Sequence, residues 1–184
     1  MRRWAPVVLG LVIASVAVML VGVALVTLMP PTEYRITRSR TIEAPRAVVL
    51  AQLEDVRAYD AWEPWRRQGT HATYSPSTRG PGAWVERSDG SSSARTTIRS
   101  VSAERVEMDN ATNGSFGARG SDQSFELRAI DDAHTEVQWV LHGELSGLPR
   151  ALWPLVDLPG RVEPEMEAAL ARLDRAAHAA ASSP

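Results

Sequence analysis

Residues 5–29 read APVVLGLVIASVAVMLVGVALVTLM, a run of 25 residues without one charged side chain. As a helix this run would be roughly 37 Å long, at about 1.5 Å per residue. A bilayer core of about 30 Å needs about 20 apolar residues, so the run is long enough to span one with some tilt. Backbone groups inside lipid must bond to one another, which makes a helix the expected structure. The sequence therefore predicts one N-terminal transmembrane helix, with the lipid bilayer as its partner.

The flanks of this run predict its orientation. Arg2 and Arg3 precede it, and Pro30-Pro-Thr-Glu33 follows it. Positive flanks stay on the cytoplasmic side, so we expect a single-pass membrane protein with its N-terminus in the cytoplasm and its C-terminal part periplasmic or extracellular. One alternative is a cleaved signal peptide, although the apolar part of a signal is usually about 7–15 residues and no small-x-small pair stands just before Pro30. A buried core helix is the other alternative. The expected domains are residues 1–33 (short tip, transmembrane helix and linker) and residues 34–184.

The composition excludes several classes of function. The chain has 184 residues, a net charge of −2 and no cysteine. About 150 residues after the apolar run suffice for one hydrophobic core. Without cysteine there is no disulfide framework and no thiolate chemistry. The weak net charge gives no reason to expect nucleic acid as a partner. All 20 basic residues are arginine, which suggests a GC-rich coding sequence and a bacterial source.

Hydrophobic periodicity predicts the elements of the second domain. Apolar residues spaced three or four apart predict helices, and alternation predicts strands. Pro45 opens the first helix, whose stripe is Val49, Leu53 and Val56. Predicted strands are 34–43, 71–75, 83–88, 93–101, 105–110, 121–130 and 135–145; predicted helices are 45–56, a short turn over 57–62, and 162–179 with the stripe Met166, Leu170, Leu173 and Ala177.

This order of elements indicates an α+β domain with an antiparallel sheet. The glycine-rich segment 113–120 is expected to be a loop, and Pro159-Gly160 is expected to break the chain before the last helix. One face of the sheet needs cover, and the long C-terminal helix is the largest cover available. A sheet that curves around one helix can enclose a mostly apolar cavity.

Several motifs, taken in order, resemble those of the START/Bet v 1-like (SRPBCC) superfamily. They are Arg38-Ser-Arg-Thr-Ile-Glu-Ala-Pro45 leading into Val48, Asp55 followed by Trp62-Glu-Pro-Trp65, the Gly80–Trp84 turn and strand, and Thr135-Glu-Val-Gln-Trp139. More narrowly, residues 34–177 look like bacterial polyketide cyclase/dehydratase-type lipid-binding proteins with an N-terminal anchor. The resemblance implies a helix-grip fold, a curved antiparallel sheet wrapped around a long C-terminal helix. It also implies a hydrophobic pocket between the two, and it implies less about chemistry because fold does not fix function.

Large apolar residues on the strands and on the last helix are the candidates for lining this pocket. Aromatic rings supply apolar area, and tryptophan adds an N–H donor. Each of these residues, taken singly, can equally be part of an ordinary core. The candidate ligand-binding residues are Trp84, Phe125, Trp139, Leu141, Trp153, Met166 and Leu170.

Catalytic and metal signals are weak in this sequence. His142 and Glu63 are the two candidates for proton transfer. The plainer interpretation of His142 is an exposed or hydrogen-bonded histidine, and that of Glu63 is a residue that is solvated or caps the short helix. Arg95, Arg99 and Arg128 could reach an anionic head group, but exposed arginines on the outer face of the sheet are the simpler expectation. The four histidines are scattered and no phosphate-binding or nucleophile motif is present, so no metal and no cofactor are expected.

These observations favour a membrane-anchored domain that binds a hydrophobic small molecule such as a lipid or polyketide-like compound, with transport or sensing of that molecule as extensions of the same role. One alternative is a cyclase or dehydratase acting on a polyketide-like substrate. The other is a protein-interaction domain whose cavity is filled by side chains. A non-catalytic role is preferred because no catalytic signature can be assigned residue by residue.

Overall fold

The computed structural model describes residues 5–28, 30–63, 69–114, 117–145, 150 and 157–182. The chain divides into two compact parts, one formed by Met1–Glu33 with Glu144–Asp157 and the other by Tyr34–Gly143 with Leu158–Pro184. The first part contains helix α1 (Ala5–Leu28), and the second contains the sheet and the helices that pack on it.

Helix α1 is long and apolar enough to cross a membrane, and a signal sequence would satisfy the same criteria. No part of the span Val8–Val26 is buried by the rest of the chain. Ser15 donates its hydroxyl to the carbonyl oxygen of Leu11 at 2.8 Å, so this polar side chain is satisfied within the helix. Its apolar surface therefore has no protein cover among the described residues.

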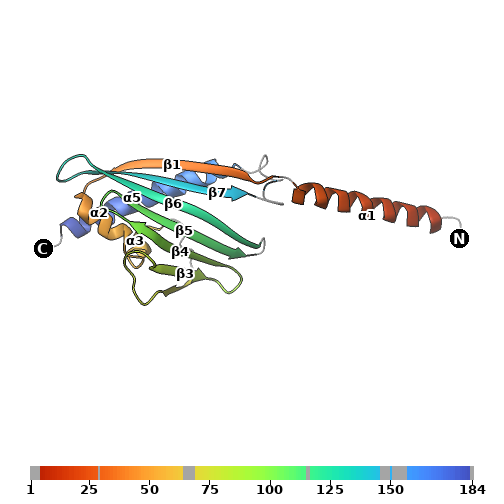
Figure 1. Ribbon diagram of the computed structural model, residues 1–184, viewed down its shortest axis with the longest axis horizontal. Helices are drawn as coiled ribbons and strands as arrows, with labels where there is room; N and C mark the ends of the chain where they lie inside the picture. The colour runs from red at the N-terminus through yellow and green to blue at the C-terminus, as the bar shows by residue number, and fades with distance from the viewer. Residues whose placement is uncertain are drawn as a thin grey trace. The chain divides into compact units, whose positions relative to one another are not determined.

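Seven antiparallel strands form one sheet in the order β1-β7-β6-β5-β4-β3-β2 (Figure 1). The first and last strands of the sequence are therefore neighbours, and β1 and β2 form the two edges. The strands are β1 (Thr32–Ile42), β2 (His71–Tyr74), β3 (Trp84–Ser88), β4 (Ser93–Val101), β5 (Arg105–Gly114), β6 (Gly117–Ala129) and β7 (Thr135–Leu145).

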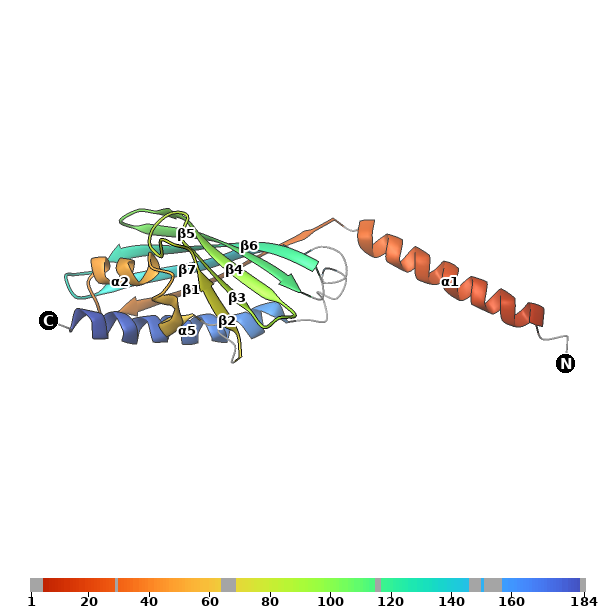
Figure 2. The ribbon, with the colours of Figure 1, turned by 90° about the horizontal axis from the view of Figure 1, so that it is seen from below.

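Three helices pack on one face of the sheet. They are α2 (Arg46–Leu53), α3 (Tyr59–Trp62) and α5 (Leu158–Ala181), and Figure 2 shows α5 running along the sheet. Helices α2 and α3 both contact α5, and α2 also contacts β6. This arrangement is the α+β fold that the order of elements predicted, with a curved antiparallel sheet and a C-terminal helix.

The predicted apolar stripes form the core between sheet and helices. Val49, Leu53 and Val56 are fully buried, as are Met166, Leu173 and Ala177, and Leu170 is 2% exposed. Val49 and Leu53 lie on one side of α2, which ends at Leu53 and not at residue 56 as predicted, so Val56 follows the helix. The α5 stripe recurs at three or four residues and lies on one side of that helix. Both sets of side chains meet the alternating apolar side of the strands. Burial of these side chains is the main source of the domain's stability.

A β-bulge on β4 bends the sheet over this core. Ile98 lies opposite Met108 and Ser100 lies opposite Glu107, so Arg99 is an extra residue on β4. Such an insertion bends the strand and increases its local twist. The bend is accompanied by a close turn at Gly82, whose φ of +86° suits glycine and whose N–H bonds to the carbonyl of Ile98.

Two predictions about chain breaks are wrong. Segment 113–120 is not a loop in its described part, because β5 continues to Gly114 and β6 begins at Gly117, with Asn113 opposite Ala118. Hydrogen bonds between the strands override the low strand propensity of glycine and asparagine. Helix α5 begins at Leu158, four residues earlier than expected, so Pro159-Gly160 lies in its first turn, where proline is tolerated, and Pro164 lies inside the helix.

Candidate functional site

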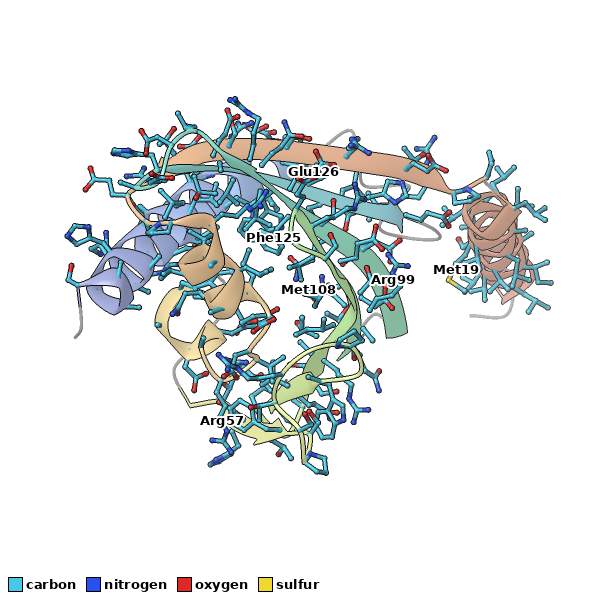
Figure 3. The ribbon with its side chains drawn as sticks, turned by 60° about the vertical axis from the view of Figure 1, so that its left-hand side comes forward. Met19, Arg57, Arg99, Met108, Phe125 and Glu126 are labelled. Atoms are coloured by element: carbon cyan, nitrogen blue, oxygen red, sulfur yellow. The ribbon has the colours of Figure 1, made fainter. Side chains whose placement is uncertain are left out.

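The sheet has an inner face, which meets the helices, and an outer face, which meets solvent. Successive residues of a strand point to opposite faces, so alternate positions share one environment. Met108 and Phe125 lie on the inner face and are fully buried, whereas Arg99 and Glu126 lie on the outer face (Figure 3).

The inner face becomes more polar along the sheet. Directly opposed residues of neighbouring strands form rows on the same face. Of three successive rows, the first is apolar, the next contains one amide, and the third is mostly polar or small. These three rows are Val106–Phe125–Trp139, then Met108–Gln123–Leu141, then Thr96–Asn110–Ser121–Gly143.

Four polar groups from this region form the inner polar cluster, made up of Thr96, Asn110, Gln123 and the indole N–H of Trp139. Trp139 donates to Oε1 of Gln123 at 3.1 Å. The Gln123 amide donates to Oδ1 of Asn110 at 3.4 Å, and the Thr96 hydroxyl donates to the same oxygen at 2.8 Å. Because buried polar groups are costly unless bonded, the network fixes these side chains in one arrangement.

The next positions on the inner face are open to solvent. Ala94 lies opposite Thr112, two residues beyond the pair Thr96 and Asn110 on each strand, and both side chains are exposed. The helical layer therefore does not cover this end of β4 and β5. The inner polar cluster lies at the boundary between the packed core and this uncovered end.

An aromatic group covers the inner polar cluster on its apolar side. Trp139 and Phe125 stack with ring centroids 5.0 Å apart. Trp62 of α3 meets both rings edge-on, at 5.8 Å from Phe125 and 6.4 Å from Trp139. Tyr59 packs against Trp62, and burial raises the pKa of its phenol well above the usual value, so it stays neutral and donates to the Leu53 carbonyl at 2.9 Å.

An arginine and two carboxylates form a second group, the acid–arginine cluster of Asp60, Glu63 and Arg87. Arg87 is only 8% exposed. Its NH2 lies 2.5 Å from Asp60 and 2.8 Å from Glu63, whose side chains are 46% and 13% exposed. Tyr74 donates to the other Asp60 oxygen at 2.6 Å. The cluster joins α3 and the residue after it to β2 and β3.

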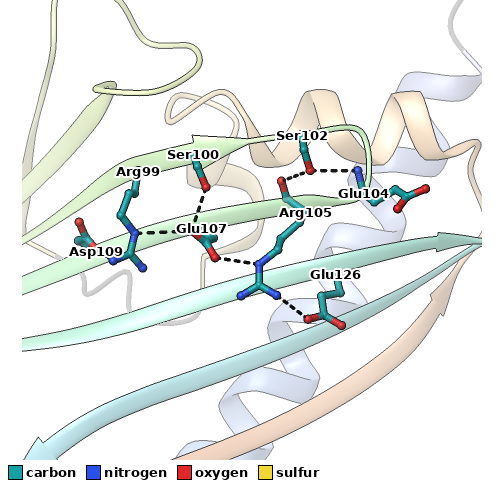
Figure 4. A network of polar contacts seen from close by, with 8 residues as sticks. All are labelled: Arg99, Ser100, Ser102, Glu104, Arg105, Glu107, Asp109 and Glu126. Atoms are coloured by element: carbon teal, nitrogen blue, oxygen red, sulfur yellow. Dashed lines mark hydrogen bonds and ion pairs between the residues drawn. The ribbon is translucent and has the colours of Figure 1, made fainter.

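The outer face carries paired charges. Arg105 bonds Glu107 at 2.8 Å and Glu126 at 2.7 Å, and Arg99 lies 3.3 Å from Asp109 (Figure 4). Arg95 and Arg128 likewise pair with Glu86 and Glu136. Each of these exposed arginines therefore has an acidic partner on its own or a neighbouring strand. For Arg95, Arg99 and Arg128, this agrees with the simpler expectation that they lie exposed on the outer face of the sheet.

The structure brings five of the seven predicted ligand-binding residues into one buried cluster. These are Phe125, Trp139, Leu141, Met166 and Leu170, none of them more than 5% exposed. Trp84 does not belong to that cluster; it is half-buried, and the Arg95 guanidinium lies 4.3 Å from its ring centroid. Trp153 lies outside the described residues. Ligand contact by any of them stays a prediction.

The two candidates for proton transfer lie on opposite faces of the sheet. His142 is half-buried on β7, opposite Asp122 in the register and on the other face from Leu141. Glu63 is the C-cap residue of α3, as one of the two plainer interpretations of it predicted. The other interpretation, a solvated carboxylate, is wrong because Arg87 holds it in a nearly buried position. Among the described residues, no group of three histidine or acidic side chains could hold a metal.

Sequence reasoning did not single out Thr96, Asn110, Gln123 or Arg87. A signal for two of them was available. Gln123 shares the alternation of Phe125 and Leu127, and Asn110 shares that of Val106 and Met108, so each is a polar residue at an inward position. The pairing of Arg87 with Asp60 could not be seen, because 27 residues separate them.

Comparison with known proteins identifies the fold. No family model and no curated protein matches the chain. Among solved structures, an uncharacterized protein from Rhizobium leguminosarum is 15% identical with a TM-score of 0.60, covering 81% of this chain and 97% of its own. The Mll3558 protein from Rhizobium loti is 19% identical with a TM-score of 0.60, covering 80% of this chain and 99% of its own.

A third similar structure is DynU16, a protein in the dynemicin biosynthetic locus. It is 14% identical with a TM-score of 0.51, over 77% of this chain and 46% of DynU16. The match thus spans about half of that protein. At these identities the likeness concerns the fold alone, which is consistent with the helix-grip arrangement.

Proposed function

We propose that the domain after α1 binds a hydrophobic small molecule between the inner face of the sheet and α5, and that α1 holds this domain at a membrane. Ligand sites are typically apolar cavities with a few placed polar groups. The observation that carries the proposal is the inner polar cluster. It is a hydrogen-bonded polar group within an apolar interior, next to the uncovered end at Ala94 and Thr112.

The membrane location is proposed from the sequence on either side of α1. Arg2 and Arg3 stand before the helix and Glu33 after it, which supports a cytoplasmic N-terminus and an extracytoplasmic domain. Protease digestion of sealed cells or spheroplasts tests this. Loss of the domain with an intact N-terminal tag supports the orientation. An intact mass of the isolated protein that lacks residues 1–29 would show a cleaved signal and remove the anchor.

Native mass spectrometry of the full chain, extracted from its host in mild detergent, tests ligand binding. We expect an additional apolar mass, reduced in Gln123→Leu, which alters the inner polar cluster. The matched control is Gln138→Leu, the same substitution at an exposed position of β7. A protein that stays free of ligand after exposure to host lipids argues against the proposal and in favour of an interaction domain with a filled interior.

Catalysis on such a ligand is the second candidate, because Glu63 is a nearly buried acid close to the aromatic group. A Glu63→Gln variant would then lose turnover of a host extract and keep the bound mass. Turnover that is unchanged in Glu63→Gln excludes Glu63 as the acid or base.

A further inference from the structure

Four buried nitrogen donors lack an acceptor among the residues that the structure describes. They are Nε1 of Trp62, NH1 of Arg87, Nδ2 of Asn110 and Nε of Arg150. Buried polar groups in folded proteins are almost always hydrogen-bonded, to protein or to water, so each exception calls for an explanation. The buried carboxylate oxygens Glu63 Oε2 and Asp109 Oδ1 differ from these donors because each pairs with an arginine, at 2.8 Å and 3.3 Å. Arg150 belongs to the other compact part of the chain, so three donors remain in the part that contains the sheet.

These three donors come from elements that are joined to one another by contacts of the inner polar cluster and the acid–arginine cluster. Asn110 and Arg87 lie on β5 and β3, with only β4 between them, which places their strands about 10 Å apart. Trp62 of α3 is linked to them, since its ring meets Trp139, whose N–H bonds to Gln123 of the inner polar cluster. Glu63 follows Trp62 in the sequence and lies 2.8 Å from Arg87, so it links the end of α3 to β3.

The charges around these donors select the kind of group that they would hold. The positive charge of Arg87 already faces two carboxylates, those of Asp60 and Glu63. Arg172 adds a second positive charge, because it donates to the carbonyl oxygens of Trp62 and Glu63 at 3.2 Å and 3.5 Å. The two arginines and the two carboxylates therefore balance, and a further anion would bring a buried charge without a counter-charge and face repulsion from both carboxylates. A neutral oxygen acceptor avoids this repulsion and still satisfies N–H donors.

We infer that this region binds the neutral carbonyl oxygen of an otherwise apolar ligand, as in a ketone, ester or amide. This inference rests on the proposed function and adds the chemistry of the ligand's polar end. Asn110 is two residues from Thr112 of the uncovered end on the same strand. Its Oδ1 already accepts from Thr96 and Gln123, so Nδ2 is the part of this amide left to donate. Trp62 on α3 and Arg87 on β3 supply further N–H groups.

Binding of three naphthalenes to the full chain in lipid nanodiscs tests the inference, with empty nanodiscs as the correction for partitioning. 2-Acetylnaphthalene carries a neutral carbonyl, 2-ethylnaphthalene has the same shape without an acceptor, and 2-naphthoate is an anion. We expect the ketone to bind roughly tenfold more tightly than the ethyl compound, the change that about one hydrogen bond makes. The infrared stretching frequency of its ¹³C-labelled carbonyl should fall on binding, as it does when the oxygen accepts a hydrogen bond.

Two variants identify the donors. Asn110→Asp removes the Nδ2 donor and keeps the oxygen that accepts from Thr96 and Gln123, and Trp62→Phe removes the indole N–H and keeps an aromatic ring. Asn113→Asp is the matched control, because Asn113 is exposed on the same strand. We expect the ketone's advantage and its frequency shift to disappear in Asn110→Asp, to shrink in Trp62→Phe, and to persist in Asn113→Asp.

Two results would overturn the inference but not the proposed function. In the first, the ketone and the ethyl compound bind equally and no frequency shift is seen. Water would then satisfy the donors, and the proposed binding of an apolar molecule would stand. Preference for naphthoate would overturn the assignment of a neutral group. If none of the three naphthalenes binds to folded protein, both the inference and the proposed function of this site fail.

Discussion

The indole Nε1 of Trp139 donates a hydrogen bond to Oε1 of Gln123 over 3.1 Å, from one buried side chain to another on the neighbouring strand. Gln123 is the central member of the inner polar cluster, because its amide also bonds Asn110. Gln123 therefore connects Trp139 to the rest of the inner polar cluster.

Replacing Gln123 by leucine should destabilise the domain by about 1–3 kcal/mol, because the indole N–H of Trp139 would stay buried without an acceptor. Urea unfolding followed by tryptophan fluorescence measures this as a lower midpoint at an unchanged slope. The control Gln138→Leu should change the free energy of unfolding by no more than about 0.5 kcal/mol. Equal effects of the two substitutions would show that the buried bond is unimportant.

Gly143→Ala should be destabilising because Tyr34 occupies the space of the new methyl group. A Cβ at Gly143 would lie 2.5 Å from the Tyr34 hydroxyl oxygen and 2.7 Å from its Cζ. Gly143 has no positive φ, so the expected cost of about 1–3 kcal/mol comes from displacing the ring. In a Tyr34→Ala background the same substitution should cost little, which a double-mutant cycle tests. Gly120→Ala, with its nearest atom at 3.9 Å, is the control.

Arg87→Met should cost about 3 kcal/mol, because it leaves the nearly buried Glu63 carboxylate without the guanidinium. The double variant Arg87→Met/Glu63→Gln should recover at least half of this loss, since no buried charge then remains unpaired. Arg95→Met provides the comparison on the outer face, where an exposed ion pair with Glu86 is worth no more than about 1 kcal/mol. A double variant that is less stable than Arg87→Met would contradict this account.

Asp89 in the turn between β3 and β4 should titrate at unusually low pH. Hydrogen bonds from the Ser92 backbone, then from the Ser91 side chain and backbone and the Ser92 hydroxyl, lower its pKa below the ordinary value of 3.8. Its contribution to stability is thus complete above about pH 4 and is lost as the pH falls toward the lower folded-state pKa.

Carboxyl-detected NMR of Ser91→Ala/Ser92→Ala tests this prediction. The double variant removes the two hydroxyl donors and keeps the two backbone donors, so the pKa of Asp89 should rise part of the way to its ordinary value. Asp131 is the internal reference, because its lowered pKa depends on the Ala133 backbone and His134 instead. An Asp89 pKa that does not move would assign the whole effect to the backbone.

Local patterns were sufficient to predict most elements of this fold. The strands at 93–101 and 135–145 have the predicted bounds, and the stripes of α2 and α5 are buried as expected. In these segments periodicity and burial agree, so the sequence alone carries the information. The continuation of β5 to Gly114 could not be predicted, since Asn113 and Gly114 are strand residues only because β6 pairs with them.

The candidate site was less accessible to such reasoning. The aromatic members Phe125 and Trp139 followed from their size and alternation. The sequence shows Asn110 and Gln123 only as polar residues at positions that face the core. Their place in the inner polar cluster depends on the hydrogen bond between them, and 13 positions separate them in the sequence. In the sequence, Arg87 is an arginine next to a glutamate on a predicted strand, which is a common pattern for exposed residues. Its burial depends on the contacts with Asp60 and Glu63, which the sequence does not reveal.

The pairing of β1 with β7 has a consequence for how the domain is made. About 100 residues lie between these neighbouring strands, and Arg38 of β1 also pairs with Glu163 and Glu167 of α5. Such distant contacts slow folding, since a long loop must close before they form. Strand β1 is the first strand to be synthesised, and its partner β7 is absent until most of the chain has been made. The sheet cannot be completed during translation, and its edge is vulnerable to aggregation until β7 arrives.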